Sequence, residues 1–172
     1  MKLKFFTRYL LLTIRYSLNS KRAFTLIEII LVIAVLGILG GVAFNIYSNF
    51  QWDVKIDEEA NRIKYILRQA QAKAISGENG ASWGVRFVYP AVGDQYYDFF
   101  WGNSYSTGTT TDRYFLSTGV TFTNPPSGSN LDIVFNKRSG NSASSSVITV
   151  SIKTIVSDTV KNISITPKGL ID

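Results

Sequence analysis

Residues 21–44 read KRAFTLIEIILVIAVLGILGGVAF, and this stretch decides how the whole chain is organised. The last sixteen of these positions contain no polar side chain. Extended over residues 24–47, the apolar segment would span about 36 Å as a helix, which exceeds the roughly 30 Å hydrocarbon core of a bilayer. The sequence therefore predicts a transmembrane helix over residues 24–47.

The charge of the chain is concentrated before this segment. The 172 residues include 18 Lys and Arg against 12 Asp and Glu, a formal net charge of +6. The first 22 residues hold basic side chains and no acidic ones, and the rest of the chain is balanced. A basic arm before an apolar helix stays in the cytoplasm, so we expect a single-pass protein of the cytoplasmic (inner) membrane with its C-terminal part extracytoplasmic. Binding of nucleic acid through a broad basic surface is disfavoured.

The composition also limits the chemistry that the chain can perform. It contains no His and no Cys. This excludes Ser-His-Asp and Cys-His nucleophilic sites, His-ligated metals, zinc-thiolate sites and disulfides. An enzyme would then need carboxylate, Lys or Ser-Lys chemistry, and no such constellation is visible. We therefore predict that the protein is not an enzyme and has no cofactor or metal site.

Three kinds of segment fit the predicted topology: a permanent signal anchor, a secretory signal removed after the apolar core, and a leader removed before it. Gly41-Val42-Ala43 offers a small-x-small site for a cut after Ala43. Glu28 argues against the first two, because a carboxylate in an apolar run costs roughly 2.5 to 3.5 kcal/mol in lipid and marks a function. A cut between Ala23 and Phe24 would provide a cationic partner, the new α-amino group of Phe24.

The residues around that position, Lys21-Arg22-Ala23-Phe24-Thr25-Leu26-Ile27-Glu28, resemble the leader junction of type IV pilins and type II secretion pseudopilins. The family usually has Gly where this chain has Ala23. The resemblance implies that a membrane prepilin peptidase removes residues 1–23, cutting between Ala23 and Phe24, and methylates the new amine of Phe24. The mature protein would then be stored in the membrane and polymerised into a filament.

The same resemblance gives roles in assembly to Phe24, Thr25 and Glu28. It implies that Glu28 of an incoming subunit neutralises the N-terminal amine of a neighbour within the apolar core of the filament. Two unpaired charges are each costly in hydrocarbon, whereas the pair is tolerable. The alternative is a glutamate tolerated near the lipid headgroups. The implied partners are other pilin or pseudopilin subunits, the prepilin peptidase, an inner-membrane assembly platform and membrane lipid.

Beyond the apolar segment, residues 48–76 are predicted to continue the helix in amphipathic form. The apolar positions of this part follow one stripe at helical spacing, while Glu59 and most charged residues lie off it. These positions are Ile56, Ala60, Ile63, Leu67, Ala70 and Ala74. We predict one helix from about Phe24 to Ser76 with Gly77 as its C-cap. Gly37, Gly40 and Gly41 are predicted to allow close helix approach or local flexibility.

Residues 77–172 are predicted to form a β-rich globular head on this helix. Short β-branched and aromatic runs alternate with turn residues, which indicates strands with one buried face. The expected strands are Ser82–Tyr89, Tyr96–Trp101, Arg113–Leu116, Val120–Thr123, Leu131–Asn136, Val147–Lys153 and Val160–Thr166. The predicted fold class is α+β, with a long N-terminal helix packed on an antiparallel head, as in pilins.

Several features of the head are candidates for binding, each with a simpler interpretation. The loops Gly102–Asp112, Asn124–Asn130 and Arg138–Ser146 are contact surfaces or solvated connectors. The aromatic run at residues 96–101 is a binding platform or, more simply, packing. Asp94 and Asp98 lack a recognisable spacing of calcium ligands. The basic pair Lys137 and Arg138 would contact DNA only if the filament takes up DNA, and is otherwise a solvated turn.

A second resemblance concerns the subgroup. Ile66–Ile75 followed by an aromatic strand, Phe135–Gly140 and Ile165–Leu170 look like the corresponding parts of H-type (GspH/FimT-like) minor pseudopilins and minor pilins. We therefore expect a minor subunit of a type IV pilus or type II secretion pseudopilus. The alternatives are a major type IV pilin, a DNA-uptake pseudopilin, or a membrane-anchored extracytoplasmic β-domain that binds a surface ligand.

Overall fold

The computed structural model describes residues 24–156 and 158–172, without the side chains of residues 42–46, 48 and 49. The predictions for the leader 1–23, including Ala23, lie outside the described residues. The chain divides into two compact units, one ending at Asn45 and the other comprising Ile46–Asp172.

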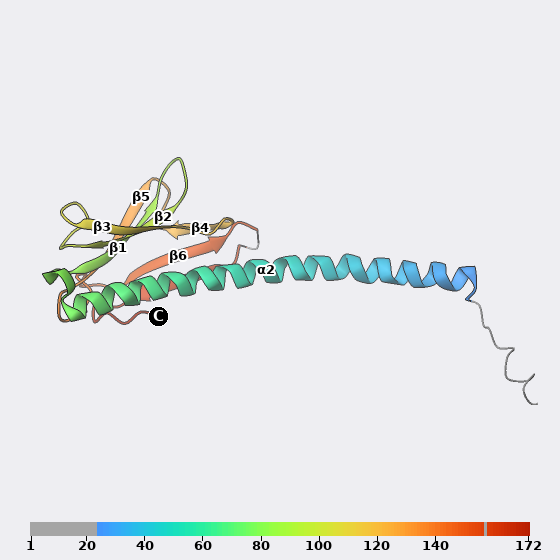
Figure 1. Cartoon of the computed structure of the whole chain (residues 1–172). Helices are drawn as coiled ribbons and strands as arrows, with labels where there is room; N and C mark the ends of the chain where they lie inside the picture. Colours follow the sequence, from blue (N-terminus) through green and yellow to red (C-terminus); the bar gives the residue numbers. More distant parts are fainter. Residues whose placement is uncertain (1–23, 157) are drawn as a thin grey trace, which may run out of the picture. The chain divides into compact units, whose positions relative to one another are not determined.

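Helix α2 runs from Leu26 to Ser76, close to the predicted bounds (Figure 1). Its end is set as the sequence predicts, because Gly77 adopts a left-handed backbone with φ of 70°. Such a conformation favours glycine, which has no Cβ. The backbone amides of Gly77 and Arg138 both donate to the carbonyl of Ala74, at 3.1 and 2.8 Å. The last turn of the helix is therefore closed partly by a loop of the head.

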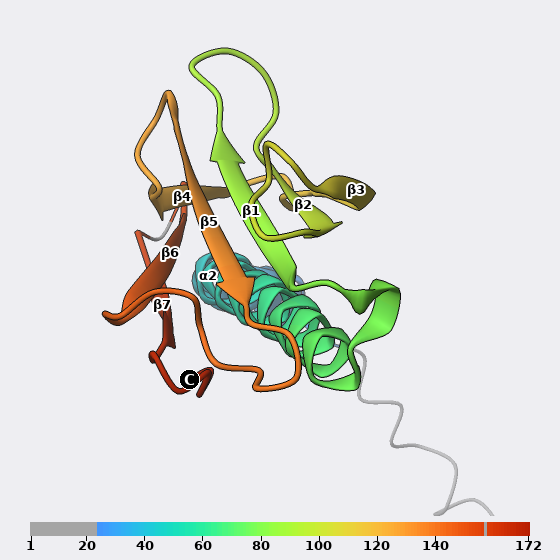
Figure 2. The same cartoon turned by 90° about the vertical axis from the view of Figure 1, so that its left-hand side faces the viewer.

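Two antiparallel sheets make up the head. The first has the strand order β3-β2-β1-β5 and the second the order β4-β6-β7. Figure 2, which looks along α2, shows both sheets around the helix. The strands are β1 (Trp83–Tyr89), β2 (Tyr96–Trp101), β3 (Thr109–Phe115), β4 (Val120–Asn124), β5 (Ser129–Phe135), β6 (Ile148–Thr154) and β7 (Val160–Ile165), with a short 3₁₀ turn η1 (Glu78–Gly80) before β1. The predicted α+β, pilin-like architecture is confirmed.

The core lies between α2 and the two sheets. All six predicted stripe positions of the helix are buried, as are alternate residues of β1, β6 and β7. Trp83 and Phe87 of β1 pack against Phe99 and Tyr97 of β2, with ring centroids 5.1 and 5.7 Å apart. Alternation in the strands and a single stripe on the helix thus supply the matching apolar surfaces.

The outer face of the first sheet differs from the prediction of a half-buried sheet. Phe100 is buried there, over Gly84, where a Cβ would lie 2.8 Å from the Phe100 ring. Beside it, the register aligns Asp132, Arg86, Asp98 and Arg113 in one row across β5, β1, β2 and β3. Opposite charges therefore alternate across all four strands, which stabilises neighbouring strand pairs.

Strand β3 begins earlier than predicted. The sequence assigned Gly102–Asp112 to a flexible loop, but Thr109–Asp112 pairs with β2 through a register shift at Phe99 and Phe100. Within the remaining loop, the Tyr105 hydroxyl donates to Asp98 at 2.7 Å. A run of Ser, Thr and Gly indicates a loop by composition, whereas pairing with a distant strand overrides it here.

Candidate processing and assembly site

The start of helix α2 is fixed by Thr25. The backbone amide of Glu28 donates to the Thr25 side-chain oxygen at 3.3 Å and to its carbonyl at 3.1 Å. Thr25 is therefore the N-cap of the helix, and Thr-x-x-Glu is the spacing of a capping box. The sequence assigned Thr25 to assembly only by resemblance, although this spacing would have predicted its capping role.

Glu28 lies in the first turn of α2 and is exposed. A carboxylate in this position interacts favourably with the partial positive charge of the helix N-terminus. In the part of the chain that the structure describes, none of the ion pairs involves Glu28. The isolated subunit thus presents this carboxylate at its surface.

Phe24 directly precedes the cap, and 73% of its surface is exposed. The residue on the other side of the predicted cut, Ala23, lies outside the described residues. The side of the junction that is described is therefore accessible and is followed immediately by an ordered helix.

The helix that follows is apolar on every side. The large apolar side chains between Leu26 and Leu39 are all exposed, from 45% at Val32 to 77% at Leu26. A helix that is hydrophobic all round is ordinarily buried in an assembly, a large core or a membrane. Within the described residues, however, we find no helix with both the length and the apolar character needed to cross a membrane. The transmembrane helix predicted over residues 24–47 is therefore not confirmed.

Gly37, Gly40 and Gly41 lie inside α2, which continues through them. A Cβ at Gly37 or Gly40 would meet no atom within 4 Å. Within the described residues, an alanine side chain at either position would therefore not clash with the rest of the subunit. Their predicted role in flexibility or close helix approach stays a prediction.

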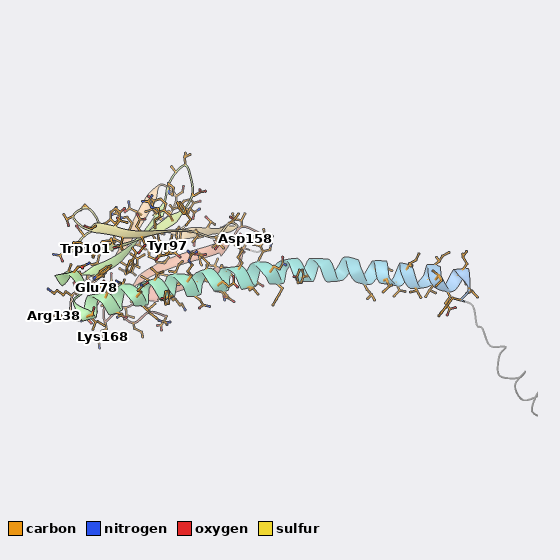
Figure 3. The ribbon with its side chains drawn as sticks, in the orientation of Figure 1. Glu78, Tyr97, Trp101, Arg138, Asp158 and Lys168 are labelled. Carbon is orange, nitrogen blue, oxygen red and sulfur yellow. The ribbon has the colours of Figure 1, made fainter. Side chains whose placement is uncertain are left out.

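The aromatic run of β2 packs in the head, as its simpler interpretation predicted. Tyr97, Phe99 and Phe100 are buried, and Tyr96 and Trp101 are half-buried (Figure 3 labels Tyr97 and Trp101). Tyr97 and Phe99 belong to the core shared with α2, whereas Phe100 packs on the outer face of the sheet. The run therefore leaves little aromatic surface for a ligand.

The two carboxylates considered for calcium have different environments. Asp98 is buried and accepts hydrogen bonds from Arg113 at 2.7 and 2.9 Å and from Tyr105. Burial by itself lowers the pKa of Arg113, but the hydrogen bond to Asp98 is the largest effect and raises that pKa well above its usual value. Asp94 is exposed in the turn before β2. The described residues contain no cluster of three or more Asp, Glu, His or Cys able to hold a metal ion.

The basic pair Lys137 and Arg138 is exposed beside the C-terminal end of α2. The amide of Arg138 closes that end, and the amide of Lys137 contacts the Ser82 hydroxyl at 3.4 Å. Cationic side chains near the negative end of a helix dipole are stabilising. The backbone of the pair thus holds a turn against the end of α2 while both side chains are exposed, in agreement with its interpretation as a solvated turn.

Two side chains of α2 have roles that the sequence did not reveal. Glu59, expected on the solvent side, is buried, and its carboxylate accepts hydrogen bonds from the Tyr97 hydroxyl at 3.3 Å and from Ser117. Gln71 donates to the carbonyls of Gly140 and Gly169, at 2.9 and 2.8 Å. These bonds join the three segments on which the predicted H-type resemblance is based.

Comparison with known proteins identifies the N-terminal part of the chain. Residues 18–44 match the prokaryotic N-terminal methylation motif. The matched residues contain the predicted cut, Thr25, Glu28 and most of the apolar segment. No curated protein and no solved structure matches the chain.

This match supports the predicted resemblance to type IV pilins and pseudopilins. A motif of this type marks a substrate of the prepilin peptidase, and it supports a pilin-like structural subunit that contacts other subunits. It covers the leader junction and the apolar helix and does not extend to the head. The match therefore does not distinguish an H-type subunit from the rest of the family.

Proposed function

We propose that the protein is a structural subunit of a type IV pilus or type II secretion pseudopilus. Its leader is removed between Ala23 and Phe24, the amine of Phe24 is methylated, and the subunit is stored in the inner membrane. It then polymerises through its N-terminal helix. The observation that carries this proposal is the methylation motif at residues 18–44, which coincides with a capped helix that is exposed and apolar on every side.

The arrangement at the start of α2 supports the role of Glu28. Thr25 accepts the hydrogen bond from the Glu28 amide, so the backbone is satisfied while the Glu28 carboxylate is left exposed. An exposed carboxylate among apolar side chains needs a cation once the helix enters an apolar environment. The methylated amine of Phe24 on a neighbouring subunit has the charge to meet that need.

Within the family we propose a minor subunit of the H type. The bridge from Gln71 to Gly140 and Gly169 supports it, because the three segments that carry the resemblance meet there. A major pilin and a DNA-uptake pseudopilin are the alternatives, and the assembly partners proposed are the same.

The test is replacement of Glu28 by Ala, made beside Glu58→Ala as a matched control. Glu58 is an exposed glutamate on the same helix. Both variants should be cleaved by the prepilin peptidase, but Glu28→Ala should lose most of its incorporation into filaments while Glu58→Ala assembles normally. Incorporation is measured by immunoblot of sheared filament fractions. Normal incorporation of the Glu28→Ala variant would contradict the proposed assembly role.

A further inference from the structure

Exposed apolar side chains lie on α2 near the start of the second compact unit and on the β6–β7 segment beside it. Tyr47, Phe50 and Val54 lie on α2, Ile155 and Val156 lie on the β6–β7 turn, and Val160 begins β7. All except Val54 are at least half exposed. We call these six residues the apolar collar.

The β6–β7 turn is held against the helix beside those residues. The Thr159 hydroxyl donates to Asp53 at 2.9 Å, and the Lys161 ammonium lies 2.7 Å from an Asp57 carboxylate oxygen. Asp53 and Asp57 are three positions from Phe50 and Val54, respectively, so all four share one side of the helix. Figure 1 shows the turn beside α2, and Figure 3 labels Asp158 within it.

The apolar character of this turn distinguishes it from the other long connections of the head. Gly102–Gly108, Pro125–Gly128 and Asn136–Val147 consist mostly of Gly, Ser, Asn, Thr and Pro. The exposed valines of the other connections, Val92 and Val147, each stand alone in their connection. In the β6–β7 turn, by contrast, branched aliphatic side chains lie outside the core, where they add little to folding. Exposed apolar side chains gathered on two neighbouring segments are typical of an interaction surface.

The charges around the collar do not favour a strongly charged partner. Lys153 pairs with Asp158, and Lys161 pairs with Asp57. Lys55 lies over the ring of Trp52, with its ammonium 5.0 Å from the ring centroid. Aromatic rings with neighbouring lysines at the end of an apolar helix are typical of the membrane–water interface.

The position of the collar along the chain fits the same partner. Tyr47 follows the apolar segment directly, and Val54 lies about 10 Å further along the helix by its rise per residue. The headgroup region adds about 5 to 8 Å on each side of the hydrocarbon core. A helix stored with residues 24–47 in the bilayer would therefore carry Tyr47 and Phe50 at the level of the headgroups and Val54 just beyond them.

We propose that the apolar collar docks the head on the headgroup region of the membrane in which the subunit is stored. This inference rests on the proposed function, because it requires residues 24–47 to be embedded. Ile155, Val156 and Val160 would then insert beside Tyr47 and Phe50, and the head would be held in one orientation on the bilayer before assembly.

The experiment uses the full chain in vesicles of phosphatidylcholine and phosphatidylglycerol. Because the chain has no cysteine, single labels can be placed at Val156→Cys, at Val92→Cys and at Leu36→Cys. Val92 is an exposed valine in the turn between β1 and β2, which stands away from α2 in Figures 1 and 2. Fluorescence quenching by lipids carrying a nitroxide near the headgroup should be several-fold stronger at position 156 than at position 92.

Any other outcome would overturn the proposed docking. The label at Leu36 shows whether the proposed membrane storage fails as well. Quenching at Leu36 by deep nitroxides with none at Val156 would contradict the docking alone. No quenching at Leu36 would contradict membrane storage, and the docking with it. Shielding of the Val156 label that disappears on dilution in detergent would identify a second copy of the chain as the partner instead.

A charged residue introduced into the apolar collar provides a second test of the docking. Ile155→Asp should markedly weaken the quenching of the Val156 label, because an aspartate is costly at the boundary of the hydrocarbon. Val92→Asp is the matched control and should leave that quenching unchanged. Equal quenching in both variants would overturn the inference.

Discussion

The two halves of helix α2 are both rich in apolar residues, yet they differ in how those residues are satisfied. Between Leu26 and Leu39 the large apolar side chains are exposed on every side, whereas between Ile56 and Ala74 the apolar stripe is buried. The second half meets one partner, the head of the same chain. The first half has apolar surface for several partners, which a filament core or a bilayer provides.

Two glutamates on the same helix show the same difference. Glu28 is exposed and interacts with the helix N-terminus through its position. Glu59 is buried and satisfied by hydroxyl donors from Tyr97 and Ser117. A buried carboxylate that has hydrogen-bond donors belongs to the fold, whereas an exposed one in an apolar segment is available to another molecule.

The largest effect is expected from a substitution in the buried stripe of the helix. Ile63→Ala removes a fully buried side chain of the stripe and should lower the free energy of unfolding by about 2 to 5 kcal/mol. Ile33→Ala, in the exposed half, should change it by less than about 0.5 kcal/mol. Both are measured by urea unfolding in detergent, followed by tryptophan fluorescence. Equal destabilisation by the two variants would contradict the division of the helix.

The second effect concerns the contact between Trp52, near the start of the buried half of α2, and Gly119 of the head. Gly119 has φ of 88°, and a Cβ there would lie 2.2 Å from the ring of Trp52. Gly119→Ala should therefore destabilise the head by about 1 to 3 kcal/mol through overpacking and backbone strain. Gly93→Ala, with φ of 107° but no atom within 4 Å, separates the strain from the clash. If both variants lose the same stability in thermal unfolding, the contact with Trp52 contributes nothing.

The buried polar pair predicts how stability depends on pH. Burial, and after it the charge of Glu59, raise the pKa of Tyr97 well above its ordinary value of 10.0. Tyr97 therefore stays protonated in the fold above pH 10, whereas the unfolded chain releases that proton. Unfolding becomes easier as the pH rises above about 10, by at most about 1.4 kcal/mol per pH unit for this group.

Tyr97→Phe should flatten this alkaline loss, because it removes the group that titrates. The measurement is the urea midpoint of both proteins between pH 8 and pH 11. The variant should also be less stable at pH 8, since the Glu59 carboxylate loses one hydrogen-bond donor. The same alkaline slope in both proteins would show that Tyr97 does not titrate with folding.

The smallest effect concerns the exposed half. Thr25→Ala removes the side-chain cap and should cost about 1 kcal/mol of local helix stability, whereas Thr25→Ser retains the cap. Amide hydrogen exchange in micelles should become faster at Glu28 and Ile29 and remain unchanged in the head. Unaltered exchange in Thr25→Ala would show that the cap does not hold the first turn.

The features that the sequence predicted well depend on local spacing. The stripe from Ile56 to Ala74, the helix end at Gly77 and the approximate positions of seven strands follow from periodicity and turn residues. The match at residues 18–44 also follows from a local motif. The capping role of Thr25 could likewise have been predicted, from the Thr-x-x-Glu spacing.

The features that the sequence did not predict depend on contacts between distant residues. Glu59 is buried because Tyr97 and Ser117 lie opposite it, and helical spacing alone places it off the stripe. The early start of β3 and the charged row across the first sheet depend on strand register. Register is set by the whole sheet and by its turns, so composition within one segment does not specify it.

The most direct test of the account is the mass of the mature chain. The full-length protein is produced together with its prepilin peptidase, and its intact mass and N-terminal peptide are measured by mass spectrometry. We predict a mature chain of residues 24–172 with one methyl group on the amine of Phe24. A mature chain that begins at Phe44, or one that retains Met1, would contradict it.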